Sequence, residues 1–175
     1  MSCTISDGLD IRCEEIVGGV KQVYISAGYV DQSGATVGSG LISDLPSPQN
    51  FYTFEQKKEF ASVTVTRTHS MENATTYDEQ MCSFKFHGLS GAEYAALKGV
   101  TQGRFQVCVE LYTGDLVVLG AKNGMECTTM TMTSGTAMGD EVSCVCEMQG
   151  REPETFFMDV SSTAFGGSTN VTLDA

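Results

Sequence analysis

The sequence has little positive charge. Ten Lys and Arg residues stand against 22 Asp and Glu residues, which gives a formal net charge of −12. A protein that binds nucleic acid through its phosphates shows the opposite balance. The charge therefore argues against direct affinity for DNA or RNA. From composition alone, an acidic surface that keeps the protein dissolved is the favoured explanation of the negative charge.

Long apolar runs are also missing. No segment approaches the ~20 consecutive apolar residues that a membrane-spanning helix needs. The N-terminus shows no basic region followed by an apolar stretch, so no secretory signal is visible. We therefore expect the protein to fold in the cytoplasm in which it is made and to contact no membrane.

Motifs for catalysis and for cofactors are absent. The chain has no Gly-x-x-x-x-Gly-Lys loop for phosphate, and its turn aspartates do not form a calcium loop. Its two histidines, His69 and His87, stand at no recognisable spacing from a carboxylate or a nucleophile. The sequence favours a protein that is not an enzyme and that holds no cofactor and no metal.

The seven cysteines show no pairing pattern. They are Cys3, Cys13, Cys82, Cys108, Cys127, Cys144 and Cys146. The number is odd and no Cys-x-x-Cys pair occurs, the nearest spacing being Cys144-Val-Cys146. We interpret these residues as reduced core thiols, which behave as small hydrophobic side chains. A metal site and redox chemistry are the less favoured alternatives.

Alternating residues from Gly124 to Gly150 predict a β-hairpin. Strict alternation places Met125, Cys127, Thr129 and Thr131 on one face of the first strand and Glu126, Thr128, Met130 and Met132 on the other. The return strand places Val142, Cys144, Cys146 and Met148 on one face. Between the strands, Gly135, Gly139 and Asp140 are candidate turn residues, because Gly and Asp tolerate the backbone conformations of a reversal.

Strand patterns extend over most of the remaining chain. We expect strands within residues 20–30, 41–45, 62–68, 76–88, 104–112 and 116–119. Residues 90–99 predict the one helix, with Ser90 and Glu93 in a capping-box arrangement, an apolar stripe of Tyr94 and Leu97, and Gly99 at its end. The pattern favours a mainly β fold, an antiparallel sandwich or barrel flanked by one α-helix, with extended hairpin or arm segments.

The domain organisation follows from length and composition. At 175 residues the chain is expected to form one domain. We assign residues 1–160 to a single β-rich domain. Residues 161–175 are rich in small residues and low in charge, which is typical of a mobile tail or of an arm that orders on a neighbour.

The order of several motifs resembles the tail tube (major tail) proteins of tailed bacteriophages, especially those of phages with Bacteroidetes hosts. The motifs are Met1-Ser-Cys-Thr-Ile-Ser-Asp-Gly8 with Cys13, Val17-Gly-Gly-Val-Lys-Gln-Val-Tyr-Ile25, Val109-Glu-Leu-Tyr-Thr-Gly-Asp115, Leu119-Gly-Ala-Lys-Asn-Gly-Met-Glu126, Gly135-Thr-Ala-Met-Gly-Asp140 and Gly150-Arg-Glu-Pro153. The likeness spans most of the chain. It implies a virion protein, folded in the host bacterial cytoplasm, with two packed antiparallel sheets, one helix and long hairpins that reach neighbours.

The function implied by this resemblance is structural. Copies would form stacked rings, most simply hexamers, that enclose the channel through which phage DNA leaves the capsid without specific binding. An acidic lumen would leave the phosphates no cations to contact. Candidate residues for the lumen or the contact between rings are Glu126, Asp140, Glu141 and Glu147. Expected partners are further copies and other tail proteins, namely the tape measure, the terminator and a sheath where there is one.

Two other functions stay open from sequence. One is a phage head-decoration or head-tail connector protein, which would share the β-rich fold. The other is a β-sandwich surface module that binds carbohydrate, for which a secretory signal and exposed aromatic residues would be expected. The chain has neither a visible signal nor a tryptophan.

Overall fold

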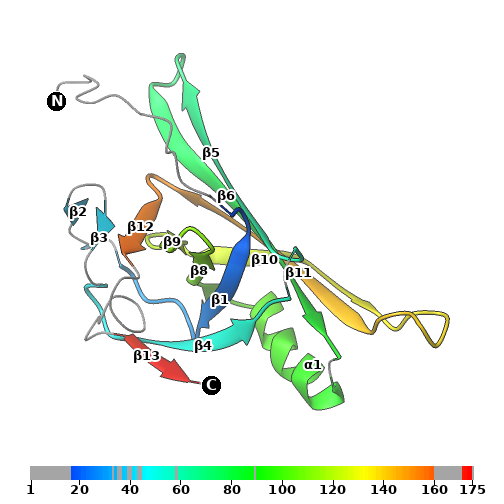
Figure 1. The fold of residues 1–175 in the computed structure, drawn as a ribbon. Helices are drawn as coiled ribbons and strands as arrows, with labels where there is room; N and C mark the ends of the chain where they lie inside the picture. The colour runs from blue at the N-terminus through cyan, green and yellow to red at the C-terminus, as the bar shows by residue number, and fades with distance from the viewer. Residues whose placement is uncertain are drawn as a thin grey trace.

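Two β-sheets and one short helix make up the part of the chain that the computed structural model describes, residues 17–32, 34, 37–38, 41–42, 45–57, 59–88, 90–159 and 171–174 (Figure 1). The elements are β1 (Val20–Ser26), β2 (Val37–Gly38), β3 (Leu41–Ile42), β4 (Gln49–Glu55), β5 (Ser62–Ser70), β6 (Thr75–His87), α1 (Gly91–Leu97), the 3₁₀ turn η1 (Lys98–Thr101), β7 (Arg104–Phe105), β8 (Val107–Leu111), β9 (Asp115–Leu119), β10 (Met125–Thr133), β11 (Ser143–Glu152), β12 (Phe156–Asp159) and β13 (Val171–Asp174). The predicted mainly β class with one helix is confirmed.

The larger sheet has eight strands in the order β13-β4-β1-β8-β9-β12-β3-β2. Its neighbours are antiparallel except for two parallel pairs, β12 with β3 and β13 with β4. The central strands β8 and β9 are buried on both faces, which explains their nearly continuous apolar sequences Val107–Leu111 and Leu116–Leu119. This sheet therefore forms the centre of the molecule.

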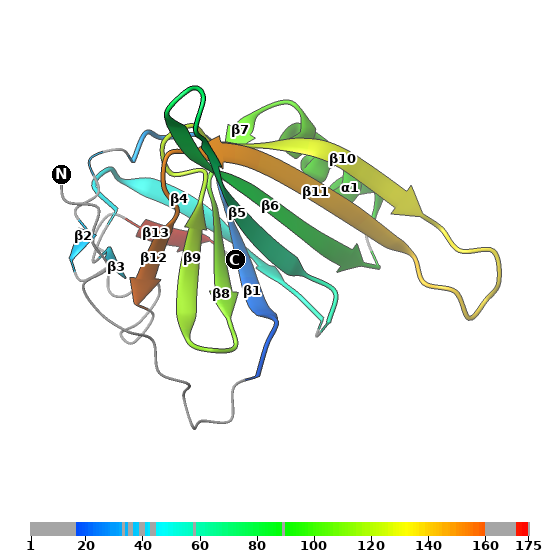
Figure 2. The same ribbon diagram turned by 90° about the horizontal axis from the view of Figure 1, so that it is seen from above.

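The smaller sheet has five strands in the order β5-β6-β11-β10-β7. Its long strands cross over the eight-stranded sheet, and the β5–β6 and β10–β11 hairpins extend beyond the body in two different directions (Figures 1 and 2). Strand β6 carries the predicted alternation, because Cys82, Phe84 and Phe86 are buried while Met81 is exposed. The predicted β10–β11 hairpin is confirmed, with residues 134–142 as its loop.

The core lies between the two sheets and continues into the curve of the larger one. The first apolar cluster joins strands β1, β8 and β9 to strands β6 and β11, with Val23, Val109, Phe84 and Met148 among its members. The second cluster lies on the opposite face of β8 and β9, and Cys108 is part of it. The alternation within β8 separates the two clusters, because successive side chains point to opposite faces.

Residues 104–112 form two strands rather than the predicted single one. Arg104 and Phe105 in β7 pair with β10 in the five-stranded sheet, whereas β8 pairs with β1 and β9 in the eight-stranded sheet. The chain passes from one sheet to the other at the buried residue Gln106. The alternating pattern continues through this residue, so the sequence alone could not show the change of partner.

A buried amide network holds this crossing in place. Gln106 donates to the carbonyl oxygen of Val30, and its own side-chain oxygen accepts from the backbone N–H of Val30 and from the side chain of Gln49. Gln49 also donates to the carbonyl of Gly28 over 2.7 Å. Because buried amides are costly without partners, these bonds fix the loop after β1 and the start of β4 to the strand crossing.

The helix confirms the predicted capping box. The backbone N–H of Ser90 donates to Oε2 of Glu93 over 2.6 Å, and the N–H of Glu93 donates to Oγ of Ser90 over 3.3 Å. Leu97 is buried, but Tyr94 is partly exposed, so the predicted stripe packs only at its C-terminal end. The prediction that Gly99 ends the helix is wrong, because the chain continues through Gly99 as η1.

The cysteine interpretation holds for the residues that the structure describes. Cys82, Cys108, Cys127, Cys144 and Cys146 are all free thiols, and all but Cys127 are buried. Cys3 and Cys13 lie outside the described residues. Of the predicted C-terminal arm, residues 161–170 and 175 also lie outside them, while β13 pairs with β4 of the same chain.

Candidate functional site

The five-stranded sheet has one face covered by the rest of the domain and one face that is open. The covered inner face carries Cys82, Phe84, Cys146 and Met148, which belong to the core between the sheets. We call the opposite side the outer face. In register across the strands, it is formed by Thr64, Thr66 and Thr68 of β5, Glu79, Met81, Ser83 and Lys85 of β6, Val145, Glu147, Gln149 and Arg151 of β11, and Glu126, Thr129, Thr131 and Thr133 of β10.

A β-bulge decides which residues of β10 belong to the outer face. The register shifts between Cys127 and Thr129, because Cys127 is opposite Met148 whereas Thr129 is opposite Glu147. The extra residue, Thr128, donates through Oγ1 to the carbonyl of Glu147. Strict alternation was therefore wrong beyond Cys127, because a bulge inserts one residue and reverses the faces that follow it.

The bulge separates threonine from methionine along β10. Thr129, Thr131 and Thr133 lie on the outer face beside Glu126, whereas Met130 and Met132 lie on the inner face with Cys127. Met130 and Cys127 pack against the core cluster. The outer face is consequently lined by hydroxyl groups and a few charges, which suits permanent contact with water.

Two of the four candidate carboxylates, Glu126 and Glu147, lie on the outer face. Both side chains are exposed. Within the described part of the chain, neither carboxylate takes part in a recorded side-chain hydrogen bond or ion pair. These two residues are thus available to give the outer face a negative charge.

The other two candidates, Asp140 and Glu141, have local roles at the hairpin loop. Asp140 Oδ2 accepts from the backbone N–H groups of Thr136 and Ala137, each over 2.8 Å. These hydrogen bonds lower the pKa of Asp140. Glu141 forms ion pairs with Lys85 and with His87, the latter over 3.2 Å. Neither residue belongs to a strand of the sheet, although Glu141 reaches Lys85 at the end of the outer face.

The two candidate turn glycines differ. Gly135 has a φ of +74°, and a Cβ there would lie 2.5 Å from the Cβ of Asp140. This position therefore requires glycine. Gly139 has ordinary backbone angles and open space around it. The sequence could not distinguish them, because the requirement arises from the hydrogen-bonded loop around Asp140.

Both cations of the outer face are neutralised by carboxylates. Lys85 pairs with Glu141, and Arg151 donates to Oε1 of Glu79 over 3.2 Å. Gln149 also donates to Glu79, over 2.7 Å. The carboxylates without an ion pair on this face are Glu126 and Glu147, so the outer face presents negative charge and no unpaired cation among the described residues.

The edges of the five-stranded sheet are open within the described chain. Strand β7 pairs with β10 only at Met125 and Glu126, so the rest of β10 as far as Thr133 has β11 as its single neighbour. Strand β5 has only β6 beside it. An edge strand offers unpaired backbone donors and acceptors to another strand. The sheet therefore has two places where a further copy of the chain could add.

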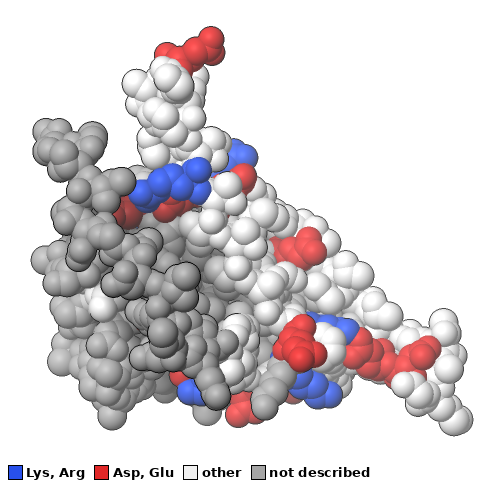
Figure 3. All heavy atoms as spheres, turned by 45° about the horizontal axis from the view of Figure 1, so that its top comes forward, with Lys and Arg blue, Asp and Glu red and all other residues white. Residues whose placement is uncertain are grey.

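The projecting hairpins carry exposed apolar residues at their ends. Met71 follows β5 in the turn to β6, and Met138 lies in the loop of β10–β11; both side chains are almost wholly exposed. Figure 3 shows both hairpins protruding from the body with acidic side chains near their ends. A contact surface on another molecule would remove these methionines from water.

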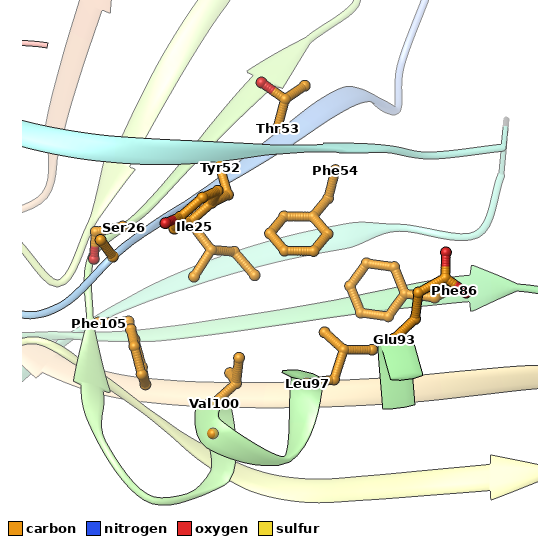
Figure 4. A pocket seen from close by; sticks show the side chains of 12 residues that line it. Ile25, Ser26, Tyr52, Thr53, Phe54, Phe86, Glu93, Leu97, Val100 and Phe105 are labelled. Atoms are coloured by element: carbon orange, nitrogen blue, oxygen red, sulfur yellow. The ribbon is translucent and has the colours of Figure 1, made fainter. Parts of the chain in front are cut away.

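A separate groove lies between the helix and the eight-stranded sheet (Figure 4). It has a volume of about 630 Å³ and is lined mainly by apolar side chains, including Ile25, Tyr52, Phe54 and Leu97. The ionisable side chain at its rim, Glu93, caps the helix through Ser90. The groove thus offers apolar surface rather than a set of reactive groups.

The structure reveals two polar sites that sequence analysis missed. Glu152 is 1% exposed, and its Oε1 accepts from the backbone N–H groups of Lys122, Asn123 and Gly124. Burial raises its pKa. His87 meets Glu141 although 54 residues separate them, because β6 lies beside β11. No spacing in the sequence signals either arrangement.

Among the described residues, no helix is both long and apolar enough to cross a membrane. Comparisons with protein-family models, with curated proteins and with solved structures found no match for this chain.

Proposed function

We propose that the protein is a structural subunit that assembles as stacked rings, most simply hexamers, into the tail tube through which phage DNA passes. The order of motifs in the sequence resembles that family. The observation that carries the proposal in the structure is the five-stranded sheet, whose outer face is open and polar. One side of β5, and one side of β10 beyond Glu126, have no neighbouring strand in the described chain.

Edge pairing gives the assembly its geometry. Strand β10 of one copy would pair with β5 of the next, so that the five-stranded sheets join around a ring. Closure removes the free edges of the five-stranded sheet, and closing a sheet is a usual way in which β-structures avoid uncontrolled association. Because β5 and β10 are different surfaces, the contact is head-to-tail, and such contacts close into rings when the rotation allows.

The difference between the covered and open faces supports one side of the sheet as the channel wall. The inner face packs on the eight-stranded sheet, so the body of each subunit must lie outside the joined sheets. The outer face is then the wall of the channel. Its threonines would be hydrated, and Glu126 and Glu147 would repel phosphates, so that DNA slides without being held.

The hairpins supply contacts along the tube axis. The loop of residues 134–142 and the turn of residues 71–74 extend beyond the body, and Met138 and Met71 are exposed near their ends (Figure 1). Contacts made by these segments would join one ring to the next. The same features also suit a head-tail connector, which would form a single ring instead of a stack.

Electron microscopy of the purified protein at rising concentration tests the proposal. We expect hollow rings or tubes of uniform bore. Thr131→Lys adds a charged side chain to the unpaired part of β10, a change that blocks edge pairing, and should reduce assembly at least tenfold at equal concentration. Thr113→Lys, in the exposed turn between β8 and β9, is the matched control and should assemble normally.

Two results would contradict the proposal. Monodisperse monomers at all concentrations would favour a self-contained binding module instead. Assemblies without an axial hole would exclude a conduit. Single rings that never stack would favour the connector.

A further inference from the structure

Four cysteines share the inner face of the five-stranded sheet. Cys82 lies on β6, Cys127 on β10, and Cys144 and Cys146 on β11. In register, Cys82 and Cys127 flank Met148 on its two sides. The Sγ atoms of Cys127 and Cys146 lie 3.5 Å apart. These two sulfurs are in direct contact, and no other pair of described cysteines has a recorded sulfur contact.

Cys127 lies directly beside the bulge in β10. Cys127 is opposite Met148 and Cys146 is opposite Met130, so the two cysteines are diagonal neighbours across the strand pair. Diagonal residues in a regular antiparallel pair have Cα atoms about 7–8 Å apart. The bulge at Thr128 bends β10 beside Cys127, and both side chains point into the same layer of the core.

We propose that Cys127 and Cys146 form an intramolecular disulfide when the folded protein meets an oxidising low-molecular-weight disulfide, such as oxidised glutathione. The bond would tie β10 to β11 beside the bulge, at the base of the projecting hairpin. This inference needs only the fold of a single copy and does not depend on the proposed function.

The reaction balances as two thiol–disulfide exchanges. The Cys127 thiolate attacks one sulfur of the small disulfide, which breaks its S–S bond and releases one small thiolate. The Cys146 thiolate then attacks the Cys127 sulfur of the mixed disulfide and releases the second small thiolate. The protons of both cysteines end on the released thiols. The protein loses two electrons and two protons in all, and the small disulfide gains them as it becomes two thiols.

Exposure sets the order of the two steps. Cys127 is partly exposed, whereas Cys146 is 2% exposed. Burial and the neighbouring thiols raise the pKa of Cys146, which leaves it mostly protonated near neutral pH. Cys127 is therefore the residue that the small disulfide reaches first, and Cys146 resolves the mixed disulfide from within the core.

Peptide mapping of the oxidised full-length protein tests the proposal. After treatment of the folded protein with oxidised glutathione and blocking of the remaining thiols, we expect a peptide pair linked through Cys127 and Cys146. A reducing agent should restore both thiols. Cys108→Ser is the matched control, because Cys108 lies in the second core cluster, and this variant should form the same link.

Variants separate the two steps. Cys146→Ser should stop at the mixed disulfide and retain one glutathione on Cys127. Cys127→Ser should react at least tenfold more slowly at Cys146, because the entry thiol is gone. A peptide map of the wild-type protein that shows Cys127 and Cys146 unlinked, or linked to other cysteines or between chains, would overturn the proposal. This measurement uses the wild-type protein and so does not depend on the folding of any variant.

Discussion

The two sheets of this protein differ in how many of their faces are buried. The eight-stranded sheet is covered on both faces by the two apolar clusters, and its central strands expose almost nothing. The five-stranded sheet is covered on one face only, and its other face carries threonines and charges. The larger sheet holds the domain together, while the smaller one divides its residues between stability and contact with the surroundings.

The difference is visible in the sequences of the strands. Strands β8 and β9 are apolar at consecutive positions, whereas β5, β6 and β10 alternate. A strand that alternates can be changed on one face without loss of the core, because the two faces have separate neighbours. A comparison of a substitution in the buried sheet with one on the outer face tests this separation directly.

The largest effect is expected in the doubly covered sheet. Leu116→Ala in β9 removes a side chain that is 1% exposed and should lower the free energy of unfolding by about 2–5 kcal/mol. Met81→Ala on the outer face removes a side chain that is 51% exposed and should change it by less than about 1 kcal/mol. Urea denaturation of both variants measures the contrast. Equal losses of stability would mean that the outer face of the five-stranded sheet contributes as much to the fold as the doubly covered sheet does.

An intermediate effect is expected at Asp78, which joins the two hairpin strands β5 and β6 to the segment before β12. Asp78 is buried, accepts from Arg67 over 2.6 Å and 3.0 Å, and accepts from the backbone N–H of Thr155 over 2.9 Å. Asp78→Asn should cost about 2 kcal/mol, the usual contribution of hydrogen bonds to a charged group. Asp115→Asn, at the exposed start of β9, is the control and should cost much less.

The effect at Asp78 should depend on pH in a defined direction. The hydrogen bond from Arg67, with those from Thr155, lowers the pKa of Asp78 from the ordinary value of 3.8. The charged pair therefore stabilises the fold above about pH 4, and this contribution is lost as the pH falls through the lowered pKa. The difference in unfolding free energy between the wild type and Asp78→Asn should shrink on acidification. A difference that grows would contradict the assignment.

The smallest effect on stability is expected on the outer face. Glu126→Lys with Glu147→Lys should change the free energy of unfolding by less than about 1 kcal/mol, because both side chains are exposed. In assembled tails the same change should slow DNA ejection several-fold, because lysines in the channel would hold phosphates. Glu55→Lys with Glu154→Lys changes the net charge equally at two exposed positions away from this face. Equal ejection rates in all three proteins would remove Glu126 and Glu147 from the channel wall.

Local patterns predicted much of this fold. The alternation of Cys82, Phe84 and Phe86 identified the buried face of β6, and the spacing of Ser90 and Glu93 identified the start of the helix. These features depend on residues that are close in sequence. For the same reason, the β10–β11 hairpin could be read from two alternating runs and the polar loop between them.

Features that depend on distant residues could not be predicted. The bulge at Thr128 is set by the pairing of β10 with β11, and it reassigns Thr129, Thr131 and Thr133 to the outer face with Glu126. The crossing at Gln106 is held by hydrogen bonds to Val30 and Gln49, which lie 76 and 57 residues earlier in the chain. Of the four predicted carboxylates, Glu126 and Glu147 share the outer face, whereas Asp140 and Glu141 are engaged in the loop.

The crossing at Gln106 also has a mechanical consequence. Strand β7 is paired with the root of β10, and one residue later the chain enters β8 at the centre of the other sheet. A pull on the projecting hairpin would reach the middle of the domain through this linkage and through the short connections from β9 to β10 and from β11 to β12. The amide cluster around Gln106 would take up the strain, and because amides carry no titratable proton, the resistance of this joint would not vary with acidity.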